Sequence, residues 1–468
     1  MQRETEGQGV TDGERRPMLA KGQDLTQGPV GRSLSRLTAP MMIAVSTSIM
    51  VQMIEIGFIG RLGTEQLAAV TFTFPLTMLL SGVALGISIG TSSVIARRVG
   101  GRDWNAVRRL ATHSVLLVFL LLSVLAALGA ATIRPTFDAL GAHGEVLEHI
   151  HDYLVIYYPG TVLFTVTMVA GNVMRATGDA RVPALVMTAG ALLNLLLDPI
   201  LIFGWLGAPR FGLTGAAFAM VLSRLVMTAV LLYIAIARRH LLLPTAAWPE
   251  RIWQSWREIL AVGIPAMATQ MIGPITGAII TRLLATHGKV VIAGFGVAGR
   301  IEAVAVMLLF ALSGSIGPFV GQNWGARAYQ RVDAGIRAAY QFSLVWGAIA
   351  WLVLWALADR LIPLVDDNPA VVASATAYLA IVPVSYGLWG VLMMASASFN
   401  SLGKPIPSTL MAVSRMFVIY VPLAMLGNHY LGYQGIFIAT ATANAIMGVV
   451  GYLWLKNWLL RPKLDAAV

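Results

Sequence analysis

Cysteine is absent from the sequence and charged residues are scarce. Of 468 residues none is cysteine, and only 12% are Asp, Glu, Lys or Arg. The first absence excludes disulfides, thiol catalysis and cysteine-ligated metals. The second is unusual, because soluble domains carry roughly 25% charged residues. Since 57% of the residues are hydrophobic and the mean hydropathy is +0.74, the composition places the chain among membrane proteins.

Several chemical motifs are also missing. The sequence has no Walker-type phosphate loop, no His/Glu cluster with zinc spacing and no Ser/His/Asp set for hydrolysis. We therefore expect no enzyme and no bound cofactor. A net charge of +11 is compatible with a nucleic-acid partner, but the basic residues lie in short loops between apolar runs, where they set membrane topology. No nucleic-acid partner is expected.

Long apolar runs recur from Leu37 to Leu459. They are continuous rather than alternating, which favours transmembrane helices over barrel strands. The predicted spans are 37–59, 67–95, 110–132, 150–173, 183–205, 213–236, 259–284, 291–320, 336–357, 374–397, 407–427 and 435–457. The predicted fold class is an all-α polytopic membrane protein with twelve transmembrane helices in two six-helix lobes, residues 37–236 and 258–457.

The segments outside the lobes are polar. Residues 1–36 lack the apolar core of a signal peptide, so we predict a disordered cytoplasmic tail. Residues 237–257 are predicted to be a cytoplasmic linker and residues 458–468 a cytoplasmic C-terminal tail. Loops after even-numbered spans are rich in arginine, which by the positive-inside rule places both termini in the cytoplasm. We expect a monomer in the plasma (inner) membrane.

The two halves align at a constant offset of 225 residues. The matching pairs include Pro40 and Pro265, Gly63 and Gly288, Gly100 and Gly325, Arg102 and Arg327, and Gly178 and Gly403. Gly212 and Gly432 also match after one loop is shortened. Repeats of six spans keep the same orientation, so the lobes are predicted to be related by a pseudo-two-fold axis along the membrane normal. Such repeats are typical of secondary transporters, which bind substrate at the repeat interface.

The segment Asn194–Pro199 places an acid inside an apolar run. An intramembrane carboxylate is costly and is by default a functional-site hypothesis. Asn194 lies one helical turn before Asp198, so the two side chains should share a face. Pro199 frees the carbonyl of Leu195 and should bend the helix there. We expect Asp198 to change protonation or to bind sodium; alternatively it forms a static pair with Arg224.

Glu55 is the second candidate acid. Ser48, Gln52 and Glu55 recur at helical spacing and predict a hydrated face; the alternative is that Glu55 is simply solvated near the outer surface. If Glu55 shares a cavity with Asp198, a proton and a cationic cargo would exclude each other there. At the offset of 225, Glu55 and Asp198 fall on Ile280 and Leu423, so ion chemistry is predicted in one lobe only.

Further polar residues lie within or near the predicted spans. Arg300 and Glu302 either line an exit path or act structurally near the outer interface. The candidates for cavity or gating roles are Gln52, Asn172, Arg224, Gln270, Arg300 and Glu302. Gly82, Gly86 and Gly90 form a small-residue ridge that predicts helix packing. Met168, Met187 and Met267 lie in spans that can border an adaptable apolar cavity.

Several segments resemble the multidrug and toxic compound extrusion (MATE) family. They are Gly57–Gly63, Leu67–Val70, Arg175–Asp179, Asn194–Asp198 and Gly321–Ala326. The resemblance covers about residues 36 to 457, and the Asn-x-x-x-Asp pattern is similar to the DinF-type branch. It implies export of cationic or amphiphilic compounds in exchange for protons or sodium.

The resemblance also implies roles for individual residues. Asp198 and Asn194 would belong to a cation site in the N-terminal lobe. Glu55 stands where the family usually has aspartate, and Tyr153 where the branch often places a hydroxyl. Some branches of the family use acidic residues in the seventh and tenth spans. This sequence has no acid at those places, and Gln270 and Tyr386 are the nearest polar residues.

Three other functions remain open. A lipid-linked precursor flippase of related fold would need a basic central cavity, for which Arg224, Arg282 and Arg415 are candidates. A receptor or scaffold is disfavoured, because the loops are too short to form a soluble domain. A channel is disfavoured by the absence of a filter-like segment.

Overall fold

The computed structural model describes residues 24–242 and 251–465, and all regular structure within them is helical. The first half contains α1 (Val30–Gly60), α2 (Thr64–Gly100), α3 (Trp104–Ala131), α4 (Ile133–Ala139), α5 (Glu145–Ala176), α6 (Arg181–Phe203), η2 (Trp205–Gly207), α7 (Leu213–Tyr233) and η3 (Ile234–Arg238). The second contains α8 (Ile252–Ala285), α9 (Lys289–Gly325), α10 (Tyr329–Leu361), η5 (Ile362–Leu364), α11 (Pro369–Ile381), η6 (Val382–Ser385), α12 (Tyr386–Ser401), α13 (Pro405–Val413), η7 (Ser414–Tyr420), α14 (Val421–Leu431), α15 (Tyr433–Trp454), η8 (Leu455–Leu460) and α16 (Arg461–Asp465).

Twelve helical stretches within the described residues are long and apolar enough to cross a membrane. Each coincides with one of the twelve predicted spans, so the predicted fold class is confirmed. The outermost helices are longer than predicted, because polar residues continue them. The first begins at Val30 and the last runs on through η8 into α16. Eight residues of the predicted linker, 243–250, lie outside the described residues, as does residue range 1–23 of the predicted tail.

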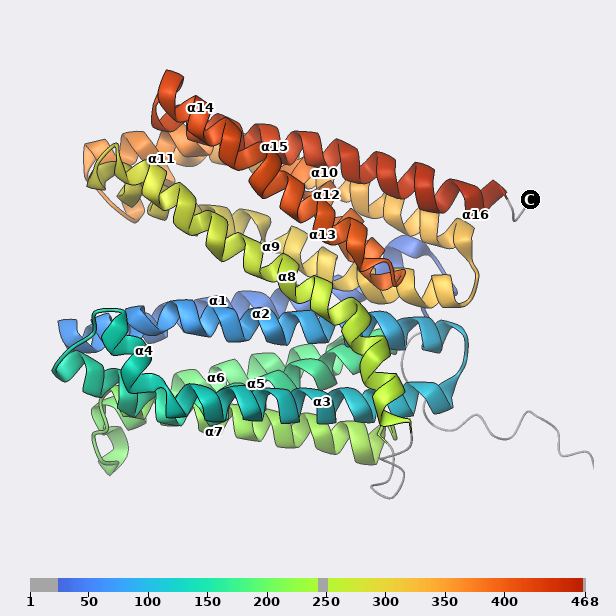
Figure 1. Cartoon of the computed structure of the whole chain (residues 1–468), viewed down its shortest axis with the longest axis horizontal. Coiled ribbons are helices and arrows are strands. Elements are labelled where there is room, and N and C mark those ends of the chain that lie inside the picture. Colours follow the sequence, from blue (N-terminus) through green and yellow to red (C-terminus); the bar gives the residue numbers. More distant parts are fainter. Residues whose placement is uncertain (1–23, 243–250, 466–468) are drawn as a thin grey trace, which may run out of the picture.

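The helices form two groups that lie side by side (Figure 1). α1 to α7 make one group and α9 to α16 the other, while α8 crosses from the edge of the first group into the second. The first group packs around one cluster of buried apolar residues and the second group around another. We call these groups the N-lobe and the C-lobe, and count α8 with the C-lobe.

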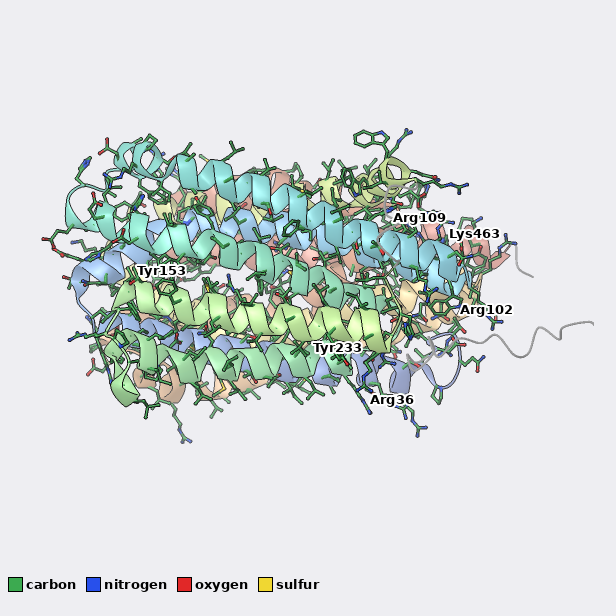
Figure 2. All side chains as sticks on the ribbon, turned by 90° about the horizontal axis from the view of Figure 1, so that it is seen from below. Arg36, Arg102, Arg109, Tyr153, Tyr233 and Lys463 are labelled. Carbon is green, nitrogen blue, oxygen red and sulfur yellow. The ribbon has the colours of Figure 1, made fainter. Side chains whose placement is uncertain are left out.

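Basic residues gather at one end of the molecule (Figure 2). Arg36, Arg102, Arg109 and Lys463 lie there, whereas Tyr153 lies toward the opposite end. This is the end at which the chain terminates in Figure 1. We call it the basic end. The distribution is the one that the loop charges predict.

The two lobes contact each other closely at and near the basic end. A Cβ atom on Gly100 of α2 would lie 1.9 Å from the carbonyl oxygen of Gln322 of α9. The Gln322 side chain also donates to the Ala176 carbonyl oxygen at 2.7 Å. Arg97 Nη1 donates to the carbonyl oxygen of Ser401 at 2.9 Å. These contacts join α2 and α5 of the N-lobe to α9 and α12 of the C-lobe.

The predicted glycine ridge packs against α8. A Cβ on Gly86 would lie 2.7 Å from the backbone nitrogen of Met267, and one on Gly90 would lie 2.5 Å from the carbonyl oxygen of Ile259. Only a residue without a side chain permits this approach of two backbones. The ridge therefore serves helix packing, as predicted.

The residues just before α1 also dock on the C-lobe. Leu25 is fully buried, and its N–H donates to Gln322 Oε1 at 3.2 Å. Its carbonyl oxygen accepts from Asn323 Nδ2 and Arg331 Nε, each at 3.1 Å. The part of the predicted tail that follows residue 23 is therefore placed by contacts with α9 and α10.

The predicted repeat is visible in the backbone. Arg102 and Arg327, 225 residues apart, both adopt a left-handed conformation with φ of 59°. Gly178 and Gly403 have φ of 91° and 73°, and Gly212 and Gly432 have φ of 59° and 61°. Non-glycine residues rarely adopt positive φ, so its recurrence at both arginines shows that the same loop is built twice.

Candidate functional site

The Asp198 carboxyl group is completely buried in α6. Its Oδ2 accepts a hydrogen bond from Asn194 Nδ2 at 3.0 Å, and Asn194 Oδ1 in turn accepts one from the Ser223 hydroxyl of α7 at 3.2 Å. The predicted proximity of Asn194 and Asp198 on one helix face is confirmed. The other oxygen, Oδ1, is buried and has no hydrogen-bond partner among the described residues. A buried acceptor left unpaired costs about 1–3 kcal/mol, and a proton or a cation on this atom would remove that cost.

Pro199 follows Asp198 inside α6. The helix continues through it to Phe203 and ends at Gly204, which has a left-handed φ of 79°. Proline therefore does not terminate the helix beside the acid; the predicted bend stays a prediction.

Glu55, Tyr153 and Arg224 surround the same region. Glu55 of α1 is half-buried, and its charge acts on Asp198. The charges of both acids act on the hydroxyl of Tyr153, a buried residue of α5 whose ring stacks on Tyr157. The predicted cation-site residues thus come together from α1, α5 and α6.

Arg224 of α7 does not form the static pair considered for Asp198. Within the described residues, no ion pair of 4.0 Å or less includes either side chain. The Arg224 guanidinium instead lies 4.8 Å from the ring centroid of Phe164 and 5.6 Å from that of Tyr157. Its charge also acts on Glu55. Arg224 is therefore a cation near the acids that pairs with neither of them.

The C-lobe holds a second polar cluster that sequence reasoning did not recognise as a unit. Glu302 Oε2 of α9 accepts hydrogen bonds from the hydroxyls of Tyr378 at 2.6 Å and Tyr386 at 2.9 Å. Arg415 of η7 donates to Asn444 Oδ1 at 2.7 Å, and its charge acts on Glu302. One signal was available: Tyr378 falls on Tyr153 at the repeat offset (378 − 153 = 225).

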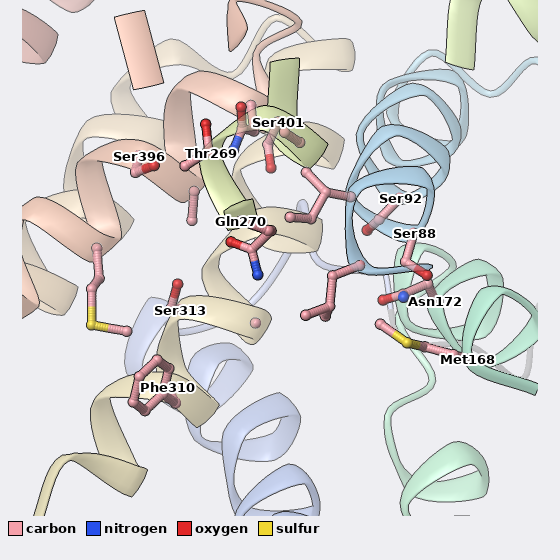
Figure 3. A pocket seen from close by; sticks show the side chains of 18 of the residues that line it. Ser88, Ser92, Met168, Asn172, Thr269, Gln270, Phe310, Ser313, Ser396 and Ser401 are labelled. Carbon is pink, nitrogen blue, oxygen red and sulfur yellow. The ribbon is translucent and has the colours of Figure 1, made fainter. Parts of the chain in front are cut away.

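A cavity of about 780 Å³ lies between the lobes (Figure 3). Both lobes line it, with α1, α2, α5, α6 and α7 on one side and α8, α9, α12, α13 and η7 on the other. Of the predicted cavity and gating residues, Asn172 and Gln270 line it. Gln52, Arg224, Arg300 and Glu302 are not among its lining residues, and Gln52 and Arg300 are exposed. Of the three methionines in spans that can border a cavity, Met168 and Met187 line it, whereas Met267 packs against Gly86.

The cavity and the acids are separate sites. Asp198, Asn194, Glu55 and Tyr153 do not line the cavity. On α6 the cavity reaches Met187, which precedes Asp198 by 198 − 187 = 11 residues, or about 16 Å at about 1.5 Å per helical residue. Along α6 the cavity therefore ends about three helical turns before Asp198.

Comparison with known proteins gives consistent matches. The MatE family model matches residues 40–200 and again 265–426, and the two starting points differ by 265 − 40 = 225 residues. A FAD transporter of Shewanella oneidensis is 33% identical over 438 residues, which cover 94% of this chain and 97% of that protein. The probable multidrug resistance protein YoeA of Bacillus subtilis is 24% identical over the same shares of the two chains. The crystal structure of the Vibrio cholerae MATE transporter VcmN in the bent form is similar with a TM-score of 0.88 and 28% identity, covering 93% of this chain and 98% of that one.

Proposed function

This chain belongs to the MATE family of multi-pass membrane transporters, and on that premise we propose that it is a secondary antiporter. It exports small organic compounds by alternating access between its lobes, driven by entry of protons or sodium. The observation that carries the proposal is the buried Asn194–Asp198 pair with one unpartnered carboxylate oxygen, beside a second acid. Intramembrane acids of this kind mark ion pathways.

The coupling ion binds at Asp198. A proton or a sodium ion on Oδ1 would satisfy the unpartnered atom and reduce the repulsion between Asp198 and Glu55. Asn194 holds the other carboxylate oxygen in place, and the Tyr153 hydroxyl lies within the field of both acids. The N-terminal lobe therefore changes charge when the ion arrives or leaves. This arrangement supports the DinF-like placement of the cation site.

Coupling between ion and cargo runs through helices. α1 carries Met41, which lines the cavity, and Glu55, which is 55 − 41 = 14 residues or about 21 Å further along. α1 also contacts the C-lobe, where Ser46 Oγ donates to Met307 Sδ at 3.1 Å. A change of charge at Glu55 and Asp198 therefore shifts a helix that borders both the cavity and the opposite lobe. This replaces the expected exclusion of proton and cargo within one cavity.

The basic end faces the cytoplasm by the positive-inside rule. Because the lobes meet near that end, the structure corresponds to a state closed toward the cytoplasm. Both termini are then cytoplasmic, and the protein resides in the plasma (inner) membrane. It acts as a monomer, because each chain supplies both lobes and the cavity between them.

The cargo is a small organic molecule of a size suited to the cavity. The relatives suggest two classes, since one is named a multidrug resistance protein and another a FAD transporter. Of the three arginines considered for the flippase alternative, Arg415 lines the cavity and Arg224 and Arg282 do not; Arg175 also lines it, so a basic cavity keeps that alternative open.

Purified protein in liposomes tests the proposal. Ethidium and FAD are offered as cargo under imposed proton or sodium gradients, and uphill accumulation is measured. Asp198→Asn keeps the size of the side chain and one acceptor oxygen for Asn194 but removes the charge, so accumulation should fall at least tenfold. Asp367→Asn, at an exposed loop position, is the matched control and should transport like the parent. Asp198→Asn with the parental rate and gradient dependence would refute the ion site.

A further inference from the structure

The charged side chains that line the cavity are all basic. Arg175 of α5 comes from the N-lobe and Arg415 of η7 from the C-lobe. No aspartate or glutamate is among the described residues that line the cavity. A cargo in this space therefore meets two guanidinium groups, one from each lobe, and no carboxylate.

Neither guanidinium has an anionic partner in contact. Arg175 is buried, and it donates from Nε and Nη2 to Asn172 Oδ1 at 3.3 and 2.7 Å. Arg415 donates to Asn444 Oδ1. Within the described part of the chain, neither takes part in an ion pair of 4.0 Å or less. Their hydrogen-bond partners are uncharged, namely these amide oxygens and, for Arg175 Nη1, Met41 Sδ at 3.4 Å, so a bound anion would compensate the buried charge.

Glu302 is the acid whose charge acts on Arg415, but it is engaged elsewhere. Its Oε2 accepts from both Tyr378 and Tyr386, and it does not line the cavity. Asn444 holds the guanidinium from one side, while the Trp389 ring centroid lies 5.9 Å from its central carbon. Arg415 therefore lines the cavity while Asn444 and Trp389 position it and leave its charge without an anionic partner in contact.

The remaining lining suits a flat ring. Phe310 and Trp389, both lining residues, pack edge to face with ring centroids 6.0 Å apart. Met168 and Met393 add polarisable apolar surface. Gln270 projects into the cavity, and Asn172 lies opposite it (Figure 3). These amides can hydrogen-bond to the edge of a heterocycle.

We propose that the cargo is an organic anion, a flat ring that carries a phosphate or carboxylate group, and that Arg415 is the residue that selects its negative charge. The assignment rests on the proposed function, because it takes the inter-lobe cavity as the place where cargo binds. Arg175 lies in the Arg175–Asp179 segment by which the chain resembles its family, so it does not distinguish this cargo from those of relatives. The cationic cargo expected from sequence would face two like charges here.

A matched pair of ligands tests the assignment. Riboflavin and riboflavin 5′-phosphate share one ring and differ by one phosphate, and ethidium is a flat cation. Binding of each to the purified full-length protein is measured by quenching of fluorescence at equilibrium. The phosphate should tighten binding at least tenfold over riboflavin, and ethidium should bind more weakly than either flavin.

Arg415→Gln removes the charge and should bring the two flavins to within about twofold of each other. Arg282→Gln, at an exposed arginine of α8 that does not line the cavity, should keep the full preference for the phosphate. Should Arg415→Gln fail to fold, Arg415→Lys keeps the charge but loses the planar fork, and should retain a reduced preference.

Two results would overturn the assignment. One is equal binding of both flavins, or tighter binding of ethidium, by the parent protein; the other is an undiminished phosphate preference in Arg415→Gln. Uphill transport that depends on Asp198 would still stand in either case. Conversely, a phosphate preference that depends on Arg415 would survive if Asp198→Asn proved harmless, so the two proposals fail separately.

Discussion

The two lobes share a backbone but differ in the charges that they bury. Paired loops repeat their left-handed residues, as at Arg102 and Arg327, and equivalent buried tyrosines lie at 153 and 378. In the N-lobe the acids near Tyr153 come from α1 and α6. In the C-lobe the acid bonded to Tyr378 comes from α9. The repeat therefore determines where the helices lie, whereas the acidic residues near the equivalent tyrosines come from different helices in the two lobes.

The arginines near these acids also lie on non-equivalent helices in the two lobes. Arg224 of α7 lies near the N-lobe acids, and its repeat equivalent is Asn444 (444 − 224 = 220, the offset that matches Gly212 with Gly432). In the C-lobe the arginine is Arg415 of η7, which lines the cavity and bonds to Asn444. Each lobe thus presents one arginine to the cavity, Arg175 from the N-lobe and Arg415 from the C-lobe, while Glu55, Asp198 and Glu302 do not line it. Under the two proposals above, ion coupling belongs to the N-lobe and Arg415 of the C-lobe selects the cargo.

The largest expected effect comes from the paired acids of the N-lobe. If Glu55 and Asp198 act as one site, Glu55→Gln should reduce gradient-driven transport about 10- to 100-fold. The double variant with Asp198→Asn should then transport at about the rate of the slower of the two single variants. Initial rates of uphill transport in liposomes measure this. Losses that multiply in the double variant would show two independent sites.

Removing a tyrosine hydroxyl should have a smaller effect, and the loss of stability should differ between the equivalent positions 153 and 378. Tyr386→Phe and Tyr378→Phe each remove a hydrogen bond to the Glu302 carboxylate, worth about 1.5–3 kcal/mol. Tyr153→Phe removes a hydroxyl that makes no hydrogen bond with another described residue, so it should cost less. Thermal unfolding in detergent compares the three variants. Equal destabilisation at 153 and 378 would mean that the lobes do not differ in this way.

The smallest of the three effects concerns the contact between lobes. Gly86→Val places a side chain against the backbone of Met267 and should destabilise the closed packing of α2 on α8 by about 1–3 kcal/mol. Gly57→Val, in another helix with open space around its Cα, is the control. Thermal unfolding together with protease accessibility at the basic end reports the result. If both valines act alike, α2 and α8 do not hold the lobes together there.

Much of the fold could be predicted because apolar periodicity and turn residues are local signals. The twelve spans, the repeat and the Asn194–Asp198 contact all follow from spacing along the chain. Helix ends were missed where polar residues extend a helix, as between Val30 and Arg36. The prediction that ion chemistry lies in one lobe only stays a prediction, and the C-lobe holds an acid of its own, Glu302, with two tyrosine partners. Glu302, Tyr386 and Arg415 come from three different helices, and no local pattern brings them together.

The cavity lining was the least predictable feature. Asn172 and Gln270 were named, but Arg175 was read only as part of a family motif and Arg415 only as one of several basic residues. Whether an arginine faces a cavity or an aromatic ring, as Arg224 does, depends on helix rotation and tilt. Those follow from packing of the whole lobe.

The central claim is that Asp198 couples an ion to cargo movement without touching the cargo. The test compares two activities of Asp198→Asn in liposomes. One is the exchange of cargo at equal concentrations on both sides, and the other is uphill accumulation of cargo under an imposed ion gradient. We predict that exchange stays within about threefold of the parent while accumulation falls at least tenfold. Loss of both activities in equal measure from a folded variant, or retention of both, would contradict the account.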